Sequence, residues 1–159
     1  MRGFWAFCAA AMLAACTPKP AAPSLRTGIR VPLPEGWSAT FPSERSLRAG
    51  PKGRSILRVE VRPAVDPSRA LPAPLALAEE FSRDATALRA TVVSEVAEKD
   101  FTLVIMEVSK QGSRARAMLG VRRLGRELFL CASEPGSGEE EVSAAAEACR
   151  GLSEGGGDS

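Results

Sequence analysis

The chain has 159 residues, with 21 Lys and Arg against 19 Asp and Glu, a net charge of +2 and no His. This length suits one domain with its own hydrophobic core. The near-neutral balance argues against a nucleic-acid partner, which requires a clearly basic face. The absence of His removes Ser–His and Cys–His nucleophile pairs and most zinc sites. Composition therefore favours a single domain without catalytic groups.

Residues 1–15 have the pattern of a secretory signal peptide. Arg2 precedes an apolar run over residues 4–12, which is shorter than the roughly 20 apolar residues of a transmembrane helix. The run ends in Leu13-Ala14-Ala15-Cys16, which resembles the lipobox of bacterial lipoproteins. This resemblance implies cleavage after Ala15 and diacylglycerol on Cys16. Ordinary secretion with a free thiol at Cys16 is the alternative.

The segment after the lipobox has the composition of a tether. Residues 16–27 include Pro18, Pro20 and Pro23 among small and polar residues, so an extended form would hold a domain about 30 Å from the bilayer. In the best-known sorting system, an Asp directly after the lipidated Cys signals retention at the inner membrane. This chain has Thr17 at that position, which by analogy indicates the outer membrane. The Gly-rich residues 153–159 are expected to be disordered. The folded domain is thus predicted to span residues 28–152.

The first part of this domain alternates apolar and polar residues as strands do. The clearest strand covers residues 56–62, where Leu57, Val59 and Val61 share one face and charged side chains share the other. Three shorter strands are predicted before it, at residues 29–33, 37–41 and 45–49.

Two segments change to helical periodicity. Residues 74–90 begin with Pro74, which suits a first helical turn. Residues 139–150 follow Ser137 and Glu140 at capping-box spacing and precede Gly151, a typical helix stop. Four strands are expected between the helices, at residues 91–97, 101–109, 114–124 and 127–133. The two apolar stripes are Leu75, Ala78, Phe81, Ala85 and Leu88 in the first helix, and Val142, Ala145, Ala146, Cys149 and Leu152 in the second.

Processing would leave two cysteines in the folded domain. Cys8 lies in the signal peptide and Cys16 in the lipobox, so Cys131 and Cys149 remain as a pair. In an oxidising compartment such a pair predicts a disulfide, and closing its short loop would stabilise the fold by roughly 3 kcal/mol. Two buried free thiols are one alternative. A redox-active pair is another, although the Cys-x-x-Cys spacing is absent.

The order of elements predicts an α+β fold, in which a mainly antiparallel sheet packs against two helices at about 74–90 and 139–150. Three stretches resemble the PsbP-like family of α/β/α sandwiches, which includes DcrB-like bacterial lipoproteins. They are Pro34-Glu35-Gly36-Trp37, the strand at residues 101–109, and Cys131 with Cys149-Arg150-Gly151-Leu152. The resemblance implies a fold and no shared reaction.

Few side chains suggest chemistry. The cluster Glu139-Glu140-Glu141 suits the positive end of a helix better than acid–base catalysis. An Arg-rich hairpin could present an anion- or partner-binding surface, because the planar guanidinium donates two hydrogen bonds to phosphate. A solvated face paired to Glu60 or Glu127 is the alternative. The arginines of this hairpin are Arg114, Arg116, Arg122, Arg123 and Arg126.

Together these patterns predict a lipid-anchored protein of the bacterial envelope, at the outer membrane, with a non-enzymatic domain that binds or supports an envelope protein. No cofactor and no metal are expected. An uncovered apolar sheet face would support partner binding. The alternative is a binder of anionic lipid or a small anionic ligand through the Arg-rich hairpin.

Overall fold

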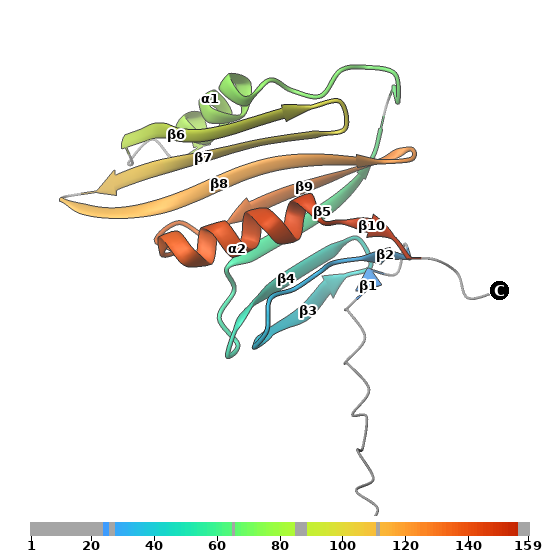
Figure 1. The fold of residues 1–159 in the computed structure, drawn as a ribbon, viewed down its shortest axis with the longest axis horizontal. Coiled ribbons are helices and arrows are strands. Elements are labelled where there is room, and N and C mark those ends of the chain that lie inside the picture. Colours follow the sequence, from blue (N-terminus) through green and yellow to red (C-terminus); the bar gives the residue numbers. More distant parts are fainter. Residues whose placement is uncertain (1–23, 26–27, 65, 85–88, 111, 156–159) are drawn as a thin grey trace, which may run out of the picture.

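The computed structural model describes residues 24–25, 28–64, 66–84, 89–110 and 112–155. Strands dominate this part of the chain, and two helices pack on a large antiparallel sheet (Figure 1). The predicted α+β class is therefore confirmed. The elements are β1 (Ser24–Leu25), β2 (Ile29–Arg30), β3 (Trp37–Ser43), β4 (Ser46–Pro51), β5 (Leu57–Pro63), α1 (Pro74–Asp84), β6 (Arg89–Glu98), β7 (Phe101–Lys110), β8 (Ser113–Leu124), β9 (Glu127–Ser133), α2 (Glu139–Arg150) and β10 (Ser153–Glu154).

The large sheet joins two meanders. Its strand order is β3-β4-β5-β9-β8-β7-β6, and every neighbouring pair is antiparallel. The first meander (β3 to β5) is followed by α1, which takes the chain to the far edge at β6. The second meander returns strand by strand until β9 pairs with β5. The two central strands thus come from distant parts of the sequence.

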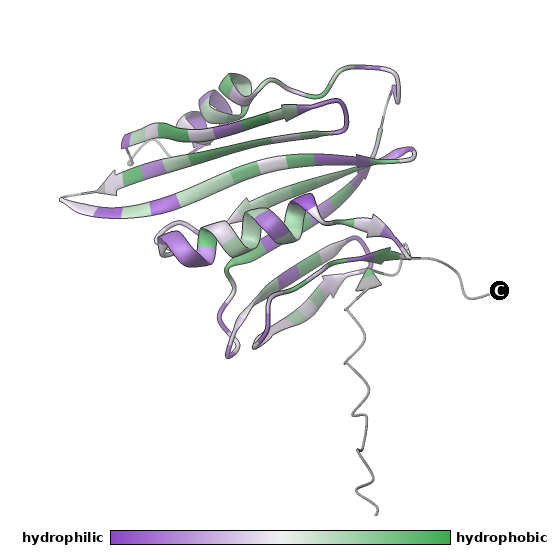
Figure 2. Ribbon diagram, in the orientation of Figure 1, coloured by the Kyte–Doolittle hydropathy of each residue, from purple (hydrophilic) through white to green (hydrophobic). Residues whose placement is uncertain are grey.

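The predicted strand β5 and helix α2 agree closely with the structure. In β5, Leu57, Val59 and Val61 are buried on one face. Helix α2 covers residues 139–150 as predicted, and its whole apolar stripe is buried. Figure 2 shows apolar stretches along β5, β6 and β7 and a mixture of apolar and polar residues along α2. Both patterns were readable because each repeats over several residues.

The start of α2 differs from the predicted capping box by one residue. Gly138, not Ser137, precedes the helix, and its backbone N–H donates to Oε2 of Glu141 at 3.1 Å. Ser137 instead donates its hydroxyl to the carbonyl of Glu134 at 2.8 Å. The turn before the helix therefore uses the hydroxyl that the spacing had assigned to the cap.

The first helix is shorter than predicted. Arg89 and Ala90, expected to be helical, pair as strand residues with Ser109 and Val108. Leu75 is 66% exposed, because the helix rests on Leu77, Ala78 and Phe81 instead. The predicted face is therefore wrong at its first position, and Ala85 and Leu88, predicted on the same face, lie outside the described residues.

The two ends of the domain also required correction. Leu25, assigned to the tether, lies in β1 and is fully buried. Ser153 and Glu154, assigned to the disordered tail, pair with Arg30 and Ile29 of β2. Such two-residue strands carry no detectable periodicity, and only their pairing around β2 defines them. Cys16 and residues 156–159 lie outside the described residues.

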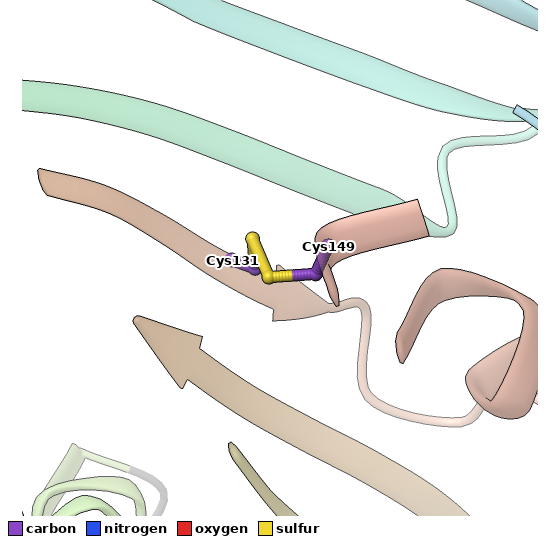
Figure 3. Close-up of a disulfide and its surroundings, with 2 residues drawn as sticks. All are labelled: Cys131 and Cys149. Carbon is purple, nitrogen blue, oxygen red and sulfur yellow. A yellow bond between two sulfur atoms is a disulfide. The ribbon is translucent and has the colours of Figure 1, made fainter. Parts of the chain in front are cut away.

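Cys131 of β9 and Cys149 of α2 form a disulfide, with Cα atoms 6.2 Å apart (Figure 3). Both residues are buried in the core between the sheet and α2. Gly120 lies opposite Cys131 on β8, and a Cβ there would lie 3.4 Å from Sγ of Cys149 and 3.0 Å from Cδ1 of Leu103. The glycine thus allows the close approach that the bond requires.

Candidate functional site

The two faces of the large sheet are covered unequally. Helix α2 lies over the middle of one face, above β5, β9 and β8 (Figure 1). Helix α1 packs mainly on β6, β7 and β8 of the other face. Its Leu77 and Phe81 join a second buried cluster with Val104 and Met106 of β7. On this second face α1 makes no comparable contact with β5 or β9 among the described residues.

A groove of about 520 Å³ lies beside α1 on this second face. Its floor includes Leu119 of β8 and Leu130 and Ala132 of β9, while Leu77 and Phe81 form the helix wall. This volume falls within the range of small-ligand sites. The residues that line it are Arg58, Glu60, Arg62, Pro72, Leu77, Glu80, Phe81, Asp84, Leu119, Gly120, Val121, Leu130, Cys131, Ala132, Ser133, Glu134 and Pro135.

The strand side of the groove is mainly basic. Arg58 and Arg62 flank Glu60 on β5, and all three line the groove. Nε of Arg58 lies 3.8 Å and a terminal nitrogen of Arg62 lies 3.3 Å from the Glu60 carboxylate. The side chains of Arg58 and Arg62 remain 48% and 66% exposed. One carboxylate thus serves two guanidiniums that still face solvent.

The neighbouring strand adds a third cation to this side. Arg48 of β4 lies directly opposite Arg58 in the antiparallel register, so both side chains point to the same face. Arg48 is exposed and makes no ion pair with any described residue. Arg58 and Arg62 line the groove, and we call them, together with the neighbouring Arg48 just outside it, the strand rim.

The helix side carries the opposite charge. Glu80 and Asp84 of α1 line the groove one helical turn apart. Both are exposed, and neither forms an ion pair within the described ranges. We call these two carboxylates the helix rim. The groove therefore has an apolar floor between a basic rim and an acidic rim.

The arginines of the predicted hairpin surface do not gather at this groove. Arg114 lies 3.7 Å from Glu107, and Arg116 lies 3.6 Å from Glu139 at the start of α2. Both are near one end of β8, on the face that packs against α2. Pairing with acidic neighbours is the arrangement expected of a solvated, charge-balanced surface.

The other three arginines lie near the opposite end of β8, about 30 Å from Arg114 at roughly 3.3 Å per residue. Arg122 lies over the ring of Phe101, 5.9 Å from its centroid. Arg123 donates to the carbonyls of Pro67 and Arg69 and so fixes the loop before α1. Arg126 is exposed in the β8–β9 turn. These five residues therefore occupy separate positions with separate contacts.

The loop held by Arg123 contains Asp66, whose carboxyl group has a lowered pKa. The Ser68 hydroxyl and backbone N–H both donate to Oδ1 of Asp66, at 2.6 and 2.9 Å. These bonds, led by the hydroxyl, lower the pKa of Asp66 below its ordinary value of 3.8. Because they favour the charged carboxylate, Asp66 is a turn-forming residue and not a poised acid.

Sequence reasoning missed the groove, although part of its signal was present. In β9, Leu128 and Leu130 alternate with Phe129 and Cys131, so both faces of the strand are apolar, which indicates cover on both sides. The distance of α1 from β9 could not be read from this pattern. No group of three metal-ligating side chains occurs within the described residues, and no described helix has the length and hydropathy needed to span a membrane.

The sequence matches no protein-family model, and a search of curated proteins gives no match. Among solved structures, the chain is similar to a crystal structure from Bacteroides thetaiotaomicron VPI-5482, with 15% identity and a TM-score of 0.44. The similarity covers 82% of this chain and 46% of that one, so the chain spans less than half of the protein it matches. A likeness at this level supports no inference about function.

Proposed function

We propose that this chain is a lipid-anchored lipoprotein of the bacterial envelope whose single domain binds a partner or ligand without catalysing a reaction. The observation that carries the binding role is the groove beside α1, where an apolar floor is left without a helix above it. A ligand or partner that covers this apolar floor gains free energy from the surface removed from water. The groove therefore supports a binding role for the domain.

The anchor part of the proposal rests on Leu13-Ala14-Ala15-Cys16. Because β1 begins at Ser24, only residues 17–23 would separate a lipidated Cys16 from this strand. Seven residues at about 3.1 Å each would span roughly 20 Å, so the domain would remain closer to the bilayer than a tether to residue 27 would allow. We place the protein at the outer membrane, on the analogy drawn from Thr17.

Replacing the lipidated residue tests the anchor. The Cys16→Ser variant should move from the membrane fraction to the soluble fraction, since it lacks the thiolate that accepts diacylglycerol. Mass spectrometry of the unchanged chain should show the acyl mass on Cys16. A Cys16→Ser chain that stays with the membranes would reject this anchor.

Filling the groove tests the binding role. Ala132 is a small residue on the groove floor, and Ala132→Trp would occupy the space without removing a core side chain. Native mass spectrometry of the full chain, extracted gently from membranes, should show a bound protein or small molecule that Ala132→Trp loses. The matched control is Thr40→Trp, an exposed position on β3 of the same sheet face. Equal retention in both variants would remove the groove from the proposed function.

A further inference from the structure

The opposite charges of the two rims restrict what the groove can accept. On the strand rim, the guanidiniums of Arg58 and Arg62 share one carboxylate, Glu60, and Arg48 of β4 adds a neighbouring cation. On the helix rim, Glu80 and Asp84 form no ion pair with a described residue. A ligand lying across the groove would therefore meet positive charge on one side and negative charge on the other. Complementarity favours an anion against β4 and β5 and a cation against α1.

The register of β4 and β5 brings two of the guanidiniums together. Arg48 and Arg58 are direct cross-strand partners, a position where Cβ atoms are about 5 Å apart and like charges destabilise the sheet. An oxyanion between them would remove the repulsion and accept charge-assisted hydrogen bonds from both planar forks. Phosphate, with oxygens in several directions, suits two or three converging guanidiniums.

The floor of the groove favours hydrocarbon over an extended peptide. Strands β5, β9 and β8 are all internal to the sheet, so their backbone groups are already paired with neighbouring strands. A peptide laid on Leu119 and Leu130 would find no backbone partners and would bury unsatisfied N–H and C=O groups. An acyl chain has no such groups and gains free energy for each buried methylene.

We propose that the groove binds a phospholipid-like amphiphile, with its phosphate at the strand rim, its hydrocarbon on the floor, and an ammonium group of its head at the helix rim. This inference rests on the proposed function, because it takes the groove as the binding site. Anchoring at Cys16 would supply the ligand, since the tether proposed above holds the domain next to a bilayer.

Probes with hydrocarbon chains of matched length but different head groups test the assignment. The full chain carrying Cys16→Ser is titrated calorimetrically with lysophosphatidylethanolamine, which has phosphate and ammonium, and with dodecyl maltoside, which is uncharged, both below their micelle concentrations. The phosphate-headed probe should bind more tightly. The Arg58→Ala/Arg62→Ala double variant should lower the affinity for this probe about tenfold or more, because it loses charge-assisted hydrogen bonds to the phosphate. Binding of dodecyl maltoside should be unchanged.

Two controls separate the rims from general effects of charge. Arg126→Ala removes an exposed arginine outside the groove and should leave both affinities unchanged. The Glu80→Gln/Asp84→Asn variant should bind lysophosphatidylethanolamine more weakly than the unchanged chain does. Its affinity for lysophosphatidylglycerol, whose head group lacks an ammonium, should be unchanged. Circular dichroism and unfolding midpoints check that each variant folds, and Ala132→Leu provides a milder block than Ala132→Trp.

Three results would overturn the lipid assignment. The first is equal affinity for the two head groups, and the second is a double variant that weakens both probes alike. The third is a bound protein, lost with Ala132→Trp, in a chain that binds neither probe. In this third case the groove remains the binding site and the proposed function stands. If Ala132→Trp changes no binding at all, the proposed function itself is rejected.

Discussion

The two sides of the large sheet follow different designs. On the α2 side, the helix, both ends of the domain and the Cys131–Cys149 disulfide close a core that includes Leu25, Val31 and Leu152. On the α1 side, the helix covers mainly the β6–β8 part and leaves an apolar floor beside charged rims. The comparison indicates that the α2 side holds the larger buried core, whereas the α1 side holds the groove proposed as the binding site.

The largest effect is expected from removing the disulfide on the α2 side. Cys131→Ala/Cys149→Ala opens a loop with a sequence separation of 18 and should lower the free energy of unfolding by about 3 kcal/mol. Denaturant unfolding of this variant against the unchanged chain gives the difference. Reduction of the unchanged chain should have a similar effect, and an unchanged unfolding midpoint in both experiments would contradict the role assigned to the bond.

The N-terminal strand should contribute nearly as much. Leu25→Ala removes a fully buried side chain from the α2-side core and should cost about 2 kcal/mol, at the low end for buried leucines because a two-residue strand can adjust. The exposed Leu75 of α1 is the matched control, and Leu75→Ala should change the unfolding midpoint little. Equal changes in the unfolding midpoint for Leu25→Ala and Leu75→Ala would mean that residues 24–25 belong to the tether and not to the folded domain.

Enlarging one residue on each side compares the two faces directly. Gly120→Ala places a methyl group 3.0 Å from Cδ1 of Leu103 and 3.4 Å from Sγ of Cys149, and should destabilise the fold by about 1–2 kcal/mol through overpacking. In Ala132→Leu the longer side chain extends into the groove, and the free energy of unfolding should fall by less than about 0.5 kcal/mol. Thermal unfolding measures both. A larger cost at Ala132 would mean that the groove side is the tightly packed one.

The smallest effect concerns the turn that leads to α1. An NMR titration should give Asp66 a pKa below 3.8, and Ser68→Ala should raise it toward that value. Because the folded-state pKa is lowered, the carboxylate's contribution is present above the ordinary pKa and is lost as the pH falls through the folded-state value. Ser82→Ala, whose hydroxyl bonds the carbonyl of Ala78, should leave the pKa of Asp66 unchanged.

Elements with long repeats were predictable from sequence. The alternation in β5 and the stripe of α2 each extend over enough residues to establish a period. The disulfide was predictable because an inward-facing Cys149 on α2 and a strand position at Cys131 leave the two cysteines on facing surfaces. The same reasoning failed at Leu25 and Ser153, where a two-residue strand has no period. It also failed at Leu75, where a helical period exists but the helix rests on Leu77, Ala78 and Phe81 instead.

The sequence by itself determined the α+β class and the pair of cysteines that close the core, because each depends on local periodicity or on residue counts. The lipobox pattern at Cys16 is also a property of the sequence alone. Only the tertiary structure decided that Arg48 lies opposite Arg58, that Arg114 and Arg123 belong to distant surfaces, and that α1 stops short of β9. These facts depend on strand register and on where a helix comes to rest, and both are set by contacts between residues far apart in the chain.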